Sequence, residues 1–192
     1  MSVIHPTFHH FNLKTTRLQE LIDWYSTVVG AEVLFQDDVG AWLSNDEANH
    51  RIALLAFPGF VDDPEKDTRT GLHRSAFEYD TFEDLNASYL RLREAGIEPA
   101  MCLDHGMTFS YYYADPDGNF VELQVDNFAS PEAATAYMRG EEFAADPIGP
   151  AFDPQAMLDA LRAGTPVSQL VTRRWALAGP PLPDPMSRMM SS

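Results

Sequence analysis

The spacing of apolar and polar residues predicts a β-hairpin late in the chain. In residues 120–125 (FVELQV) the aliphatic side chains fall on one face of a strand, and Glu122 falls on the other face. Residues 108–114 are β-branched and aromatic, which suits a partner strand. The segment 115–118 (DPDG) has the composition of a tight turn. We therefore predict strand, turn and strand, with a carboxylate in the middle of the second strand.

A strand followed by a helix is predicted near the start of the chain. Residues 8–13 form the strand, and apolar residues then recur at helical spacing up to residue 29. Thr16 and Gln19 have the spacing of a capping box, and Gly30 is a typical helix end. Three further strands are expected at 32–35, 41–43 and 51–57.

The same order of elements then occurs a second time. A strand is predicted at 72–79, and a helix runs to Ala95 and ends at Gly96. Strands follow at 97–101, 108–114 and 120–125, and helices at 131–143 and 153–163. The fold class is thus α+β, with two tandem βαβββ modules whose sheets form a shared cleft and with a C-terminal helical extension. The expected division is 1–60 for the first module, 61–71 for a linker, 72–128 for the second module, and 129–192 for the extension with its Pro-rich tail.

Overlaying the first strands of the two modules selects candidate site residues. The apolar side of each strand is expected to pack under its helix. The opposite side carries His10 in the first module and Arg74 in the second. Glu122 lies on the corresponding polar face of its own strand. We therefore expect His10, Arg74 and Glu122 to point into one cleft.

The charge of the chain excludes several partners. Asp and Glu total 29 against 13 Lys and Arg, so the formal net charge is −16. This argues against binding to nucleic acid or to anionic membrane surfaces. The single cysteine, Cys102, excludes an internal disulfide and is interpreted as buried and inert. The chain has no apolar run of transmembrane length and no signal-peptide pattern, so we expect a cytoplasmic protein.

Three segments carry a family resemblance: HHFNLKTTRLQELIDWYSTVVGAEV, GLHRSAFEY and YYYADPDGNFVELQ. They resemble the vicinal-oxygen-chelate superfamily, which includes glyoxalase I, fosfomycin- and bleomycin-resistance proteins, and type I extradiol ring-cleaving dioxygenases. Within that superfamily they are most similar to small extradiol dioxygenases. The resemblance implies an oxidoreductase that opens a catechol-like aromatic ring with dioxygen.

The resemblance also implies a metal and its ligands. Extradiol dioxygenases of this type hold Fe(II) or Mn(II) with one His from the first strand of each module and one Glu from the last strand. His10 and Glu122 match the first and third of these positions. His105 and Tyr112 match two residues that act in proton transfer and hydrogen bonding.

The second ligand position departs from the family pattern. Arg74 stands where the family has a His, and His73 stands one residue earlier. A shift of one residue in a regular strand moves a side chain to the opposite face. Either a bulge turns His73 inward and completes the metal site, or Arg74 takes the ligand position. Arg has no lone pair for a metal, so the second case leaves a metal-free pocket in which Arg74 pairs with Glu122.

Three hypotheses remain open from the sequence. The first is a metal-dependent extradiol dioxygenase. The second is a metal-free enzyme of the same fold, in which Arg74 stabilises a phenolate or enolate of an aromatic or polyketide-like substrate. The third is a non-catalytic protein that sequesters an aromatic small molecule. A homodimer is expected from the general frequency of symmetric oligomers. His5 and His50 fit no pattern and are interpreted as structural or exposed.

Overall fold

The computed structural model describes residues 3–183. Residues 184–192 of the predicted Pro-rich tail lie outside this range. The chain divides into two compact units. The first unit contains the described part of residues 1–65 together with 115–119, and the second contains 66–114 and the described residues from 120 onward.

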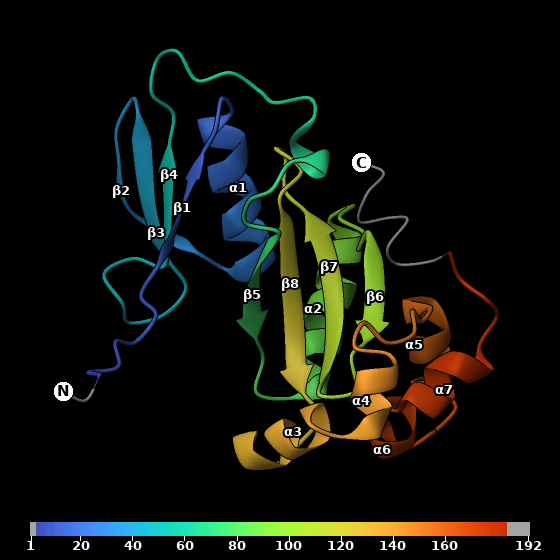
Figure 1. Ribbon diagram of the computed structural model, residues 1–192. Helices are drawn as coiled ribbons and strands as arrows, with labels where there is room; N and C mark the ends of the chain where they lie inside the picture. Colours follow the sequence, from blue (N-terminus) through green and yellow to red (C-terminus); the bar gives the residue numbers. More distant parts are fainter. Residues whose placement is uncertain (1–2, 184–192) are drawn as a thin grey trace. The chain divides into compact units, whose positions relative to one another are not determined.

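The first unit is a mixed sheet with a single long helix (Figure 1). Its strand order is β1-β4-β3-β2, with β1 parallel to β4 and the other pairs antiparallel. Helix α1 packs on β3 and β4 through an apolar face that includes Leu21, Tyr25 and Val28. The elements are β1 (Phe11–Lys14), α1 (Leu18–Val29), β2 (Glu32–Gln36), β3 (Gly40–Ser44) and β4 (Ile52–Leu55).

The two ends of α1 differ in how well the sequence predicts them. Gly30 ends the helix with φ 67°, and its N–H donates to the carbonyl of Tyr25, as expected. The predicted capping box is wrong, because Arg17 is the N-cap and makes no side-chain cap bond. The hydroxyl of Thr16 donates instead to Asp62 at 2.6 Å, and Gln19 donates to Asp23 at 2.8 Å. Both side chains therefore bond to other side chains and do not cap the helix.

The second unit repeats this topology. Its sheet has the order β5-β8-β7-β6, with β5 parallel to β8. The predicted strand at 97–101 is displaced, because the N–H of Ile97 bonds to Leu92 and so belongs to the end of α2. The elements are the 3-10 turn η1 (Lys66–Thr68), β5 (Arg74–Glu78), α2 (Phe82–Glu94), β6 (Met101–Asp104), β7 (Thr108–Ala114) and β8 (Phe120–Asp126).

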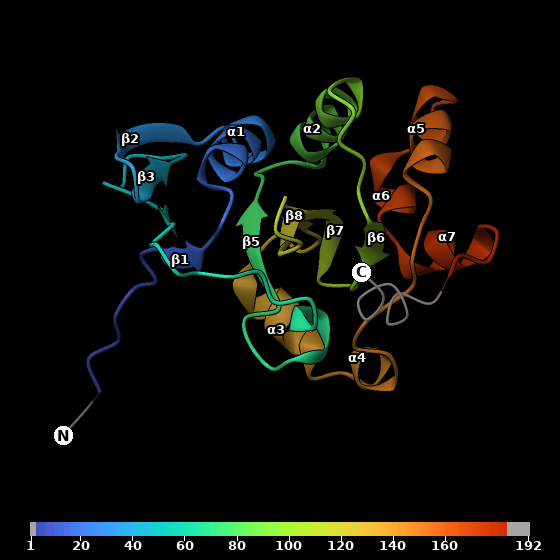
Figure 2. The same ribbon diagram turned by 90° about the horizontal axis from the view of Figure 1, so that it is seen from above.

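Within the described residues, five short helices follow β8, and Figure 2 shows them beside the second sheet. The single helix predicted at 131–143 is interrupted at Gly140, whereas Asp153 caps a helix as expected, its side chain accepting from the N–H of Gln155. Phe152 packs on Phe109 with ring centroids 4.1 Å apart. The helices are α3 (Pro131–Met138), α4 (Glu141–Ala145), α5 (Pro154–Arg162), α6 (Val167–Leu170) and α7 (Arg173–Ala178).

The observed elements confirm the α+β class, the tandem βαβββ modules and the C-terminal helices. The shared cleft stays a prediction. Cys102 is buried, as expected. Among the described residues, none of the helices has the length and apolar character that crossing a membrane requires.

Candidate active site

Three neighbouring strands of the second unit present a polar face. Glu122 on β8 lies opposite Tyr112 on β7 and opposite Ala76 on β5. Arg74 lies two residues before Ala76 and therefore on the same face. The alternation seen in the sequence thus places Arg74, Tyr112 and Glu122 together. Glu122 is only 2% exposed.

Both carboxylate oxygens of Glu122 have partners. The Nε of Arg74 donates to Oε2 at 2.5 Å, and the hydroxyl of Tyr112 donates to Oε1 at 2.8 Å. The guanidinium of Arg74 also lies over the ring of Tyr112, 5.5 Å from its centroid. A buried carboxylate is costly unless it is paired and hydrogen-bonded, and these contacts supply that compensation.

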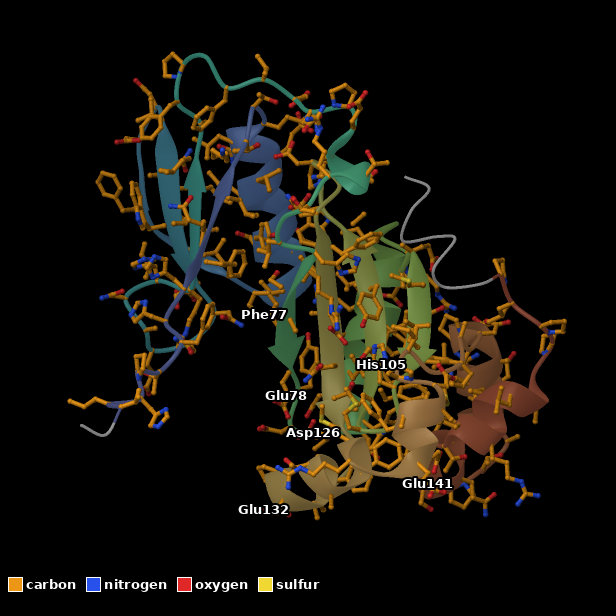
Figure 3. All side chains as sticks on the ribbon, viewed as in Figure 1. Phe77, Glu78, His105, Asp126, Glu132 and Glu141 are labelled. Carbon is orange, nitrogen blue, oxygen red and sulfur yellow. The ribbon has the colours of Figure 1, made fainter. Side chains whose placement is uncertain are left out.

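His105 extends the network from the turn between β6 and β7 (Figure 3). Its Nδ1 lies 2.6 Å from the carbonyl of Ile148, which can only accept, so Nδ1 carries a hydrogen. Its Nε2 lies 2.6 Å from the hydroxyl of Tyr112. Arg173 donates to the carbonyl of His105 at 2.8 Å and fixes the turn. Burial lowers the pKa of His105, although the charge of Glu122 acts in the opposite direction, so the imidazole is neutral at pH 7.

The hydroxyl of Tyr112 lies between two acceptors. Burial, and then the charge of Glu122, raise the pKa of Tyr112, so the phenol keeps its proton. That single proton serves either Oε1 of Glu122 or Nε2 of His105, but not both. A proton added at Nε2 would let His105 donate to Tyr112 while Tyr112 donates to Glu122. In the chain His105–Tyr112–Glu122, Nε2 is therefore the position at which an added proton completes both hydrogen bonds.

His73 lies at the edge of this network, beside Arg74. It is exposed, and its ring lies 5.9 Å from that of Phe120. Its Nδ1 is 3.4 Å from Nη1 of Arg74. The pairing of β5 with β8 is regular from Arg74 to Glu78. The side chain in contact with Glu122 is thus that of Arg74.

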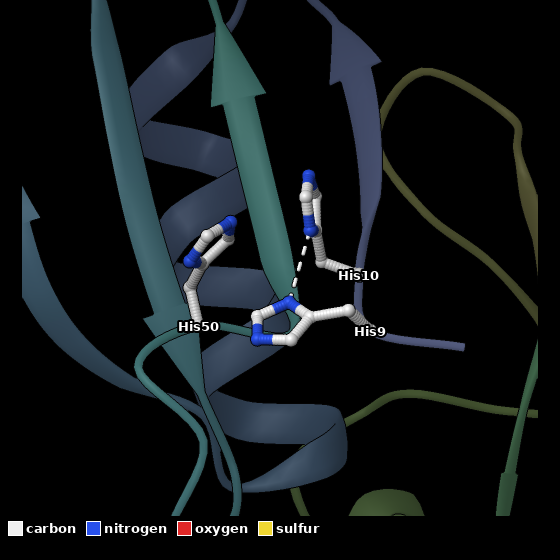
Figure 4. Close-up of side chains that lie close together, drawn as sticks. All are labelled: His9, His10 and His50. Atoms are coloured by element: carbon white, nitrogen blue, oxygen red, sulfur yellow. Dashed lines mark hydrogen bonds between the residues drawn. The ribbon is translucent and has the colours of Figure 1, made fainter. Parts of the chain in front are cut away.

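His10 belongs to the first unit, directly before β1. Figure 4 shows it beside His9 and His50. Among the described residues, these three form the one group of three His, Cys, Asp or Glu side chains whose ligand atoms all lie within 4.8 Å of one another. Sequence reasoning gave His50 no role. A parallel pairing of β1 with β4 that aligns the starts of the two strands would have placed His50 beside His10.

Comparison with known proteins gives the family. Residues 7–123 match the family model described as Glyoxalase/Bleomycin resistance protein/Dioxygenase superfamily. The chain is 45% identical over 187 residues to biphenyl-2,3-diol 1,2-dioxygenase 2 of Rhodococcus globerulus, covering 97% of this chain and 98% of that protein. It is 47% identical over 172 residues to biphenyl-2,3-diol 1,2-dioxygenase 3 of the same organism, covering 90% of each.

A solved structure agrees at the level of the fold. The glyoxylase/bleomycin resistance protein/dioxygenase domain from Frankia sp. EAN1pec superposes with a TM-score of 0.55 at 19% identity. The match covers 66% of this chain and 96% of that domain. The resemblance that the sequence motifs carry is therefore confirmed. The chain belongs to the Glyoxalase/Bleomycin resistance protein/Dioxygenase superfamily.

Proposed function

We propose that this chain is an extradiol-type dioxygenase that opens the ring of a catechol-like aromatic diol with dioxygen. The observation that carries the proposal is its similarity, over nearly its full length, to two dioxygenases named for biphenyl-2,3-diol. The chain spans 98% and 90% of these relatives, so the similarity extends beyond the two modules into the C-terminal helices.

The buried network of the second unit supports this chemistry. A diol must lose a hydroxyl proton before its ring is opened, and neutral His105 would accept it at Nε2, which faces the hydroxyl of Tyr112. Once Nε2 carries that proton, His105 would donate to the hydroxyl of Tyr112, and Tyr112 would donate to Glu122. Each of these roles can be tested by substitution.

The dioxygenase relatives imply a non-haem metal, which when bound offers open positions to the diol and to dioxygen. The surroundings of Glu122 do not fit such a metal as they stand. One carboxylate oxygen pairs with Arg74, a residue that cannot be a ligand, and the other binds Tyr112. The ligand set His10, His73 and Glu122, with Fe(II) or Mn(II), stays a proposal.

A second candidate function follows from the same ion pair. If Arg74 remains on Glu122, the chain is a metal-free enzyme in which Arg74 holds an aromatic oxyanion and His105 acts as the base. Arg74 is therefore the residue that decides between the two functions.

The deciding experiment measures metal content and oxygen consumption together. The full chain is purified anaerobically, incubated with Fe(II) or Mn(II), analysed for bound metal, and assayed with 2,3-dihydroxybiphenyl and with catechol. The proposal expects diol-dependent oxygen uptake with a ring-opened product, and loss of that activity in His10→Ala. Oxygen uptake absent with every diol, despite a folded and metal-loaded chain, would reject ring cleavage and favour the second candidate.

The cytoplasmic location and the homodimer expected from the sequence stay predictions.

A further inference from the structure

Three imidazoles meet at one end of the first sheet (Figure 4). Nδ1 of His9 lies 3.0 Å from Nδ1 of His10. The ring centroid of His50 lies 4.2 Å from that of His10 and 5.2 Å from that of His9. His9 and His10 are exposed and His50 is partly buried. The proposed ring-cleavage function uses His10 from this group and neither of the other two.

The topology of the first sheet brings these residues together. β1 and β4 are parallel, with Phe11 opposite Ile52, so the residues before both strands lie at the same end. The N–H of Phe11 donates to the carbonyl of Arg51 at 3.1 Å. The guanidinium of Arg51 in turn donates to the carbonyl of His9 at 2.8 Å. The backbone carbonyl and the side chain of Arg51 thus fix the segment that carries His9 and His10 to the segment that carries His50.

Neighbouring polar groups leave lone pairs available for a metal. Nδ1 of His50 lies 2.8 Å from Oδ1 of Asn49, which can only accept, so Nδ1 carries the hydrogen and Nε2 keeps a lone pair. A polar partner on one ring nitrogen that frees the other is the usual arrangement around metal-bound His. The positive charge of Arg51 is offset by Asp46, whose carboxylate lies 2.8 Å from the guanidinium.

We propose that His9, His10 and His50 form a binding site for a Zn²⁺-type cation that does not include Glu122 and that shares only His10 with the ligand set of the proposed function. Three imidazole nitrogens with an open fourth position suit Zn²⁺, Cu²⁺ or Ni²⁺, whereas Mn²⁺ and Fe²⁺ bind such donors more weakly. Zn–N bonds of 2.0–2.1 Å in tetrahedral geometry place ligand nitrogens about 3.3 Å apart. The His9–His10 separation of 3.0 Å is close to this value, and the third ligand atom lies within 4.8 Å of the other two. Rotation of exposed side chains closes the remaining gap.

The test is zinc binding by the full chain after treatment with a chelator, followed by calorimetry or by competition with a coloured chelator. His50→Ala and His9→Ala remove cluster ligands that the proposed oxygenase does not use. His5→Ala is the matched control, because His5 is also an exposed His of the first unit but lies outside the cluster. Glu122→Gln removes the ligand of the proposed ring-cleavage metal and leaves the cluster intact.

We expect one Zn²⁺ per chain at the cluster. His50→Ala and His9→Ala should each weaken its binding at least about 10-fold, since even loss of an outer partner of a metal-bound His has that effect. His5→Ala and Glu122→Gln should bind as the wild type does. Cu²⁺ bound to the wild type should show electron paramagnetic resonance splitting from His nitrogens that diminishes in His50→Ala. His9→Ala supplies the same comparison if His50→Ala fails to fold.

Two results would overturn the site. One is a wild-type zinc affinity in folded His50→Ala together with an unchanged copper spectrum. The other is zinc binding that is lost in Glu122→Gln but kept in His50→Ala, which would assign the ion to the proposed ring-cleavage site. Neither result depends on oxygen uptake, so failure of this inference and failure of the proposed function are distinguishable.

Discussion

The two modules share a topology and differ in what equivalent positions carry. Their strand orders correspond, β1-β4-β3-β2 and β5-β8-β7-β6. In each module one pair of strands is parallel, β1 with β4 and β5 with β8. In the second module Glu122 lies between Ala76 and Tyr112. The corresponding position in the first module is Ala53, between Asn12 and Trp42.

That difference explains where the polar chemistry sits in each module. The second module has the carboxylate of Glu122 in mid-strand, and Arg74 and Tyr112 donate hydrogen bonds to this buried charge. The first module has only the methyl group of Ala53 there, so that position offers His10 no carboxylate. Its imidazole lies instead at the exposed end of the strand with His9 and His50. One scaffold thus supports a buried hydrogen-bond chain and a largely exposed cluster of imidazoles.

The largest effect is expected from Tyr112→Phe. This change removes the hydroxyl that joins His105 to Glu122, and loss of general acid–base function typically costs about 10²–10⁴-fold in rate. The measurement is diol-dependent oxygen uptake at saturating substrate. Tyr113→Phe is the control, because Tyr113 is equally buried on the same strand and, among the described residues, its hydroxyl has no hydrogen-bond partner. Equal losses in the two variants would contradict the proton chain.

Ala53→Glu tests the comparison by giving the first module the carboxylate of the second. Ala53 is 1% exposed, and no Arg or Tyr occupies the positions that serve Glu122. An unpaired buried charge should lower the free energy of unfolding by about 3 kcal/mol or more at pH 7. Ala53→Gln, similar in size but neutral, isolates the charge. We expect urea denaturation to show the two variants converging below about pH 5, where the new carboxyl is protonated. A constant difference at all pH values would show that size alone is responsible.

Arg74→His tests whether the second module can be returned to the family pattern. The change removes the cation from Glu122 and places an imidazole on the same face of β5. We expect affinity for Fe(II) or Mn(II) to rise at least about 10-fold. Loss of a residue that only hydrogen-bonds to a metal ligand already changes metal affinity by about that factor, and a direct ligand should change it by no less. Arg74→Met removes the cation without adding a ligand. If both variants gain metal equally, release of Glu122 is sufficient, and an imidazole at position 74 does not act as a ligand.

The sequence predicted those parts of the molecule that depend on local alternation. The bounds of β7 follow from its run of β-branched and aromatic residues, and the shared face of Arg74 and Glu122 follows from a period of two along each strand. What it missed depends on contacts between distant segments. The carbonyl of Ile148, which fixes the tautomer of His105, comes from the loop between α4 and α5. His50 acquires a role only from the register of β1 with β4, which no periodicity reveals.

The smallest effect is expected in the pH dependence of stability, measured on metal-free protein. Burial lowers the pKa of His105 below its value in the unfolded chain, which is about 6.5. Just below that pH the unfolded chain therefore binds more protons than the folded one, and the free energy of unfolding falls as the pH decreases. His105→Gln should make this fall shallower when urea denaturation is followed from about pH 7.5 down to about pH 5. His5→Gln, which changes an exposed His, should keep the wild-type slope. Parallel curves for wild type and His105→Gln would mean that folding leaves the pKa of His105 unchanged, which would contradict the burial of this imidazole in its neutral form.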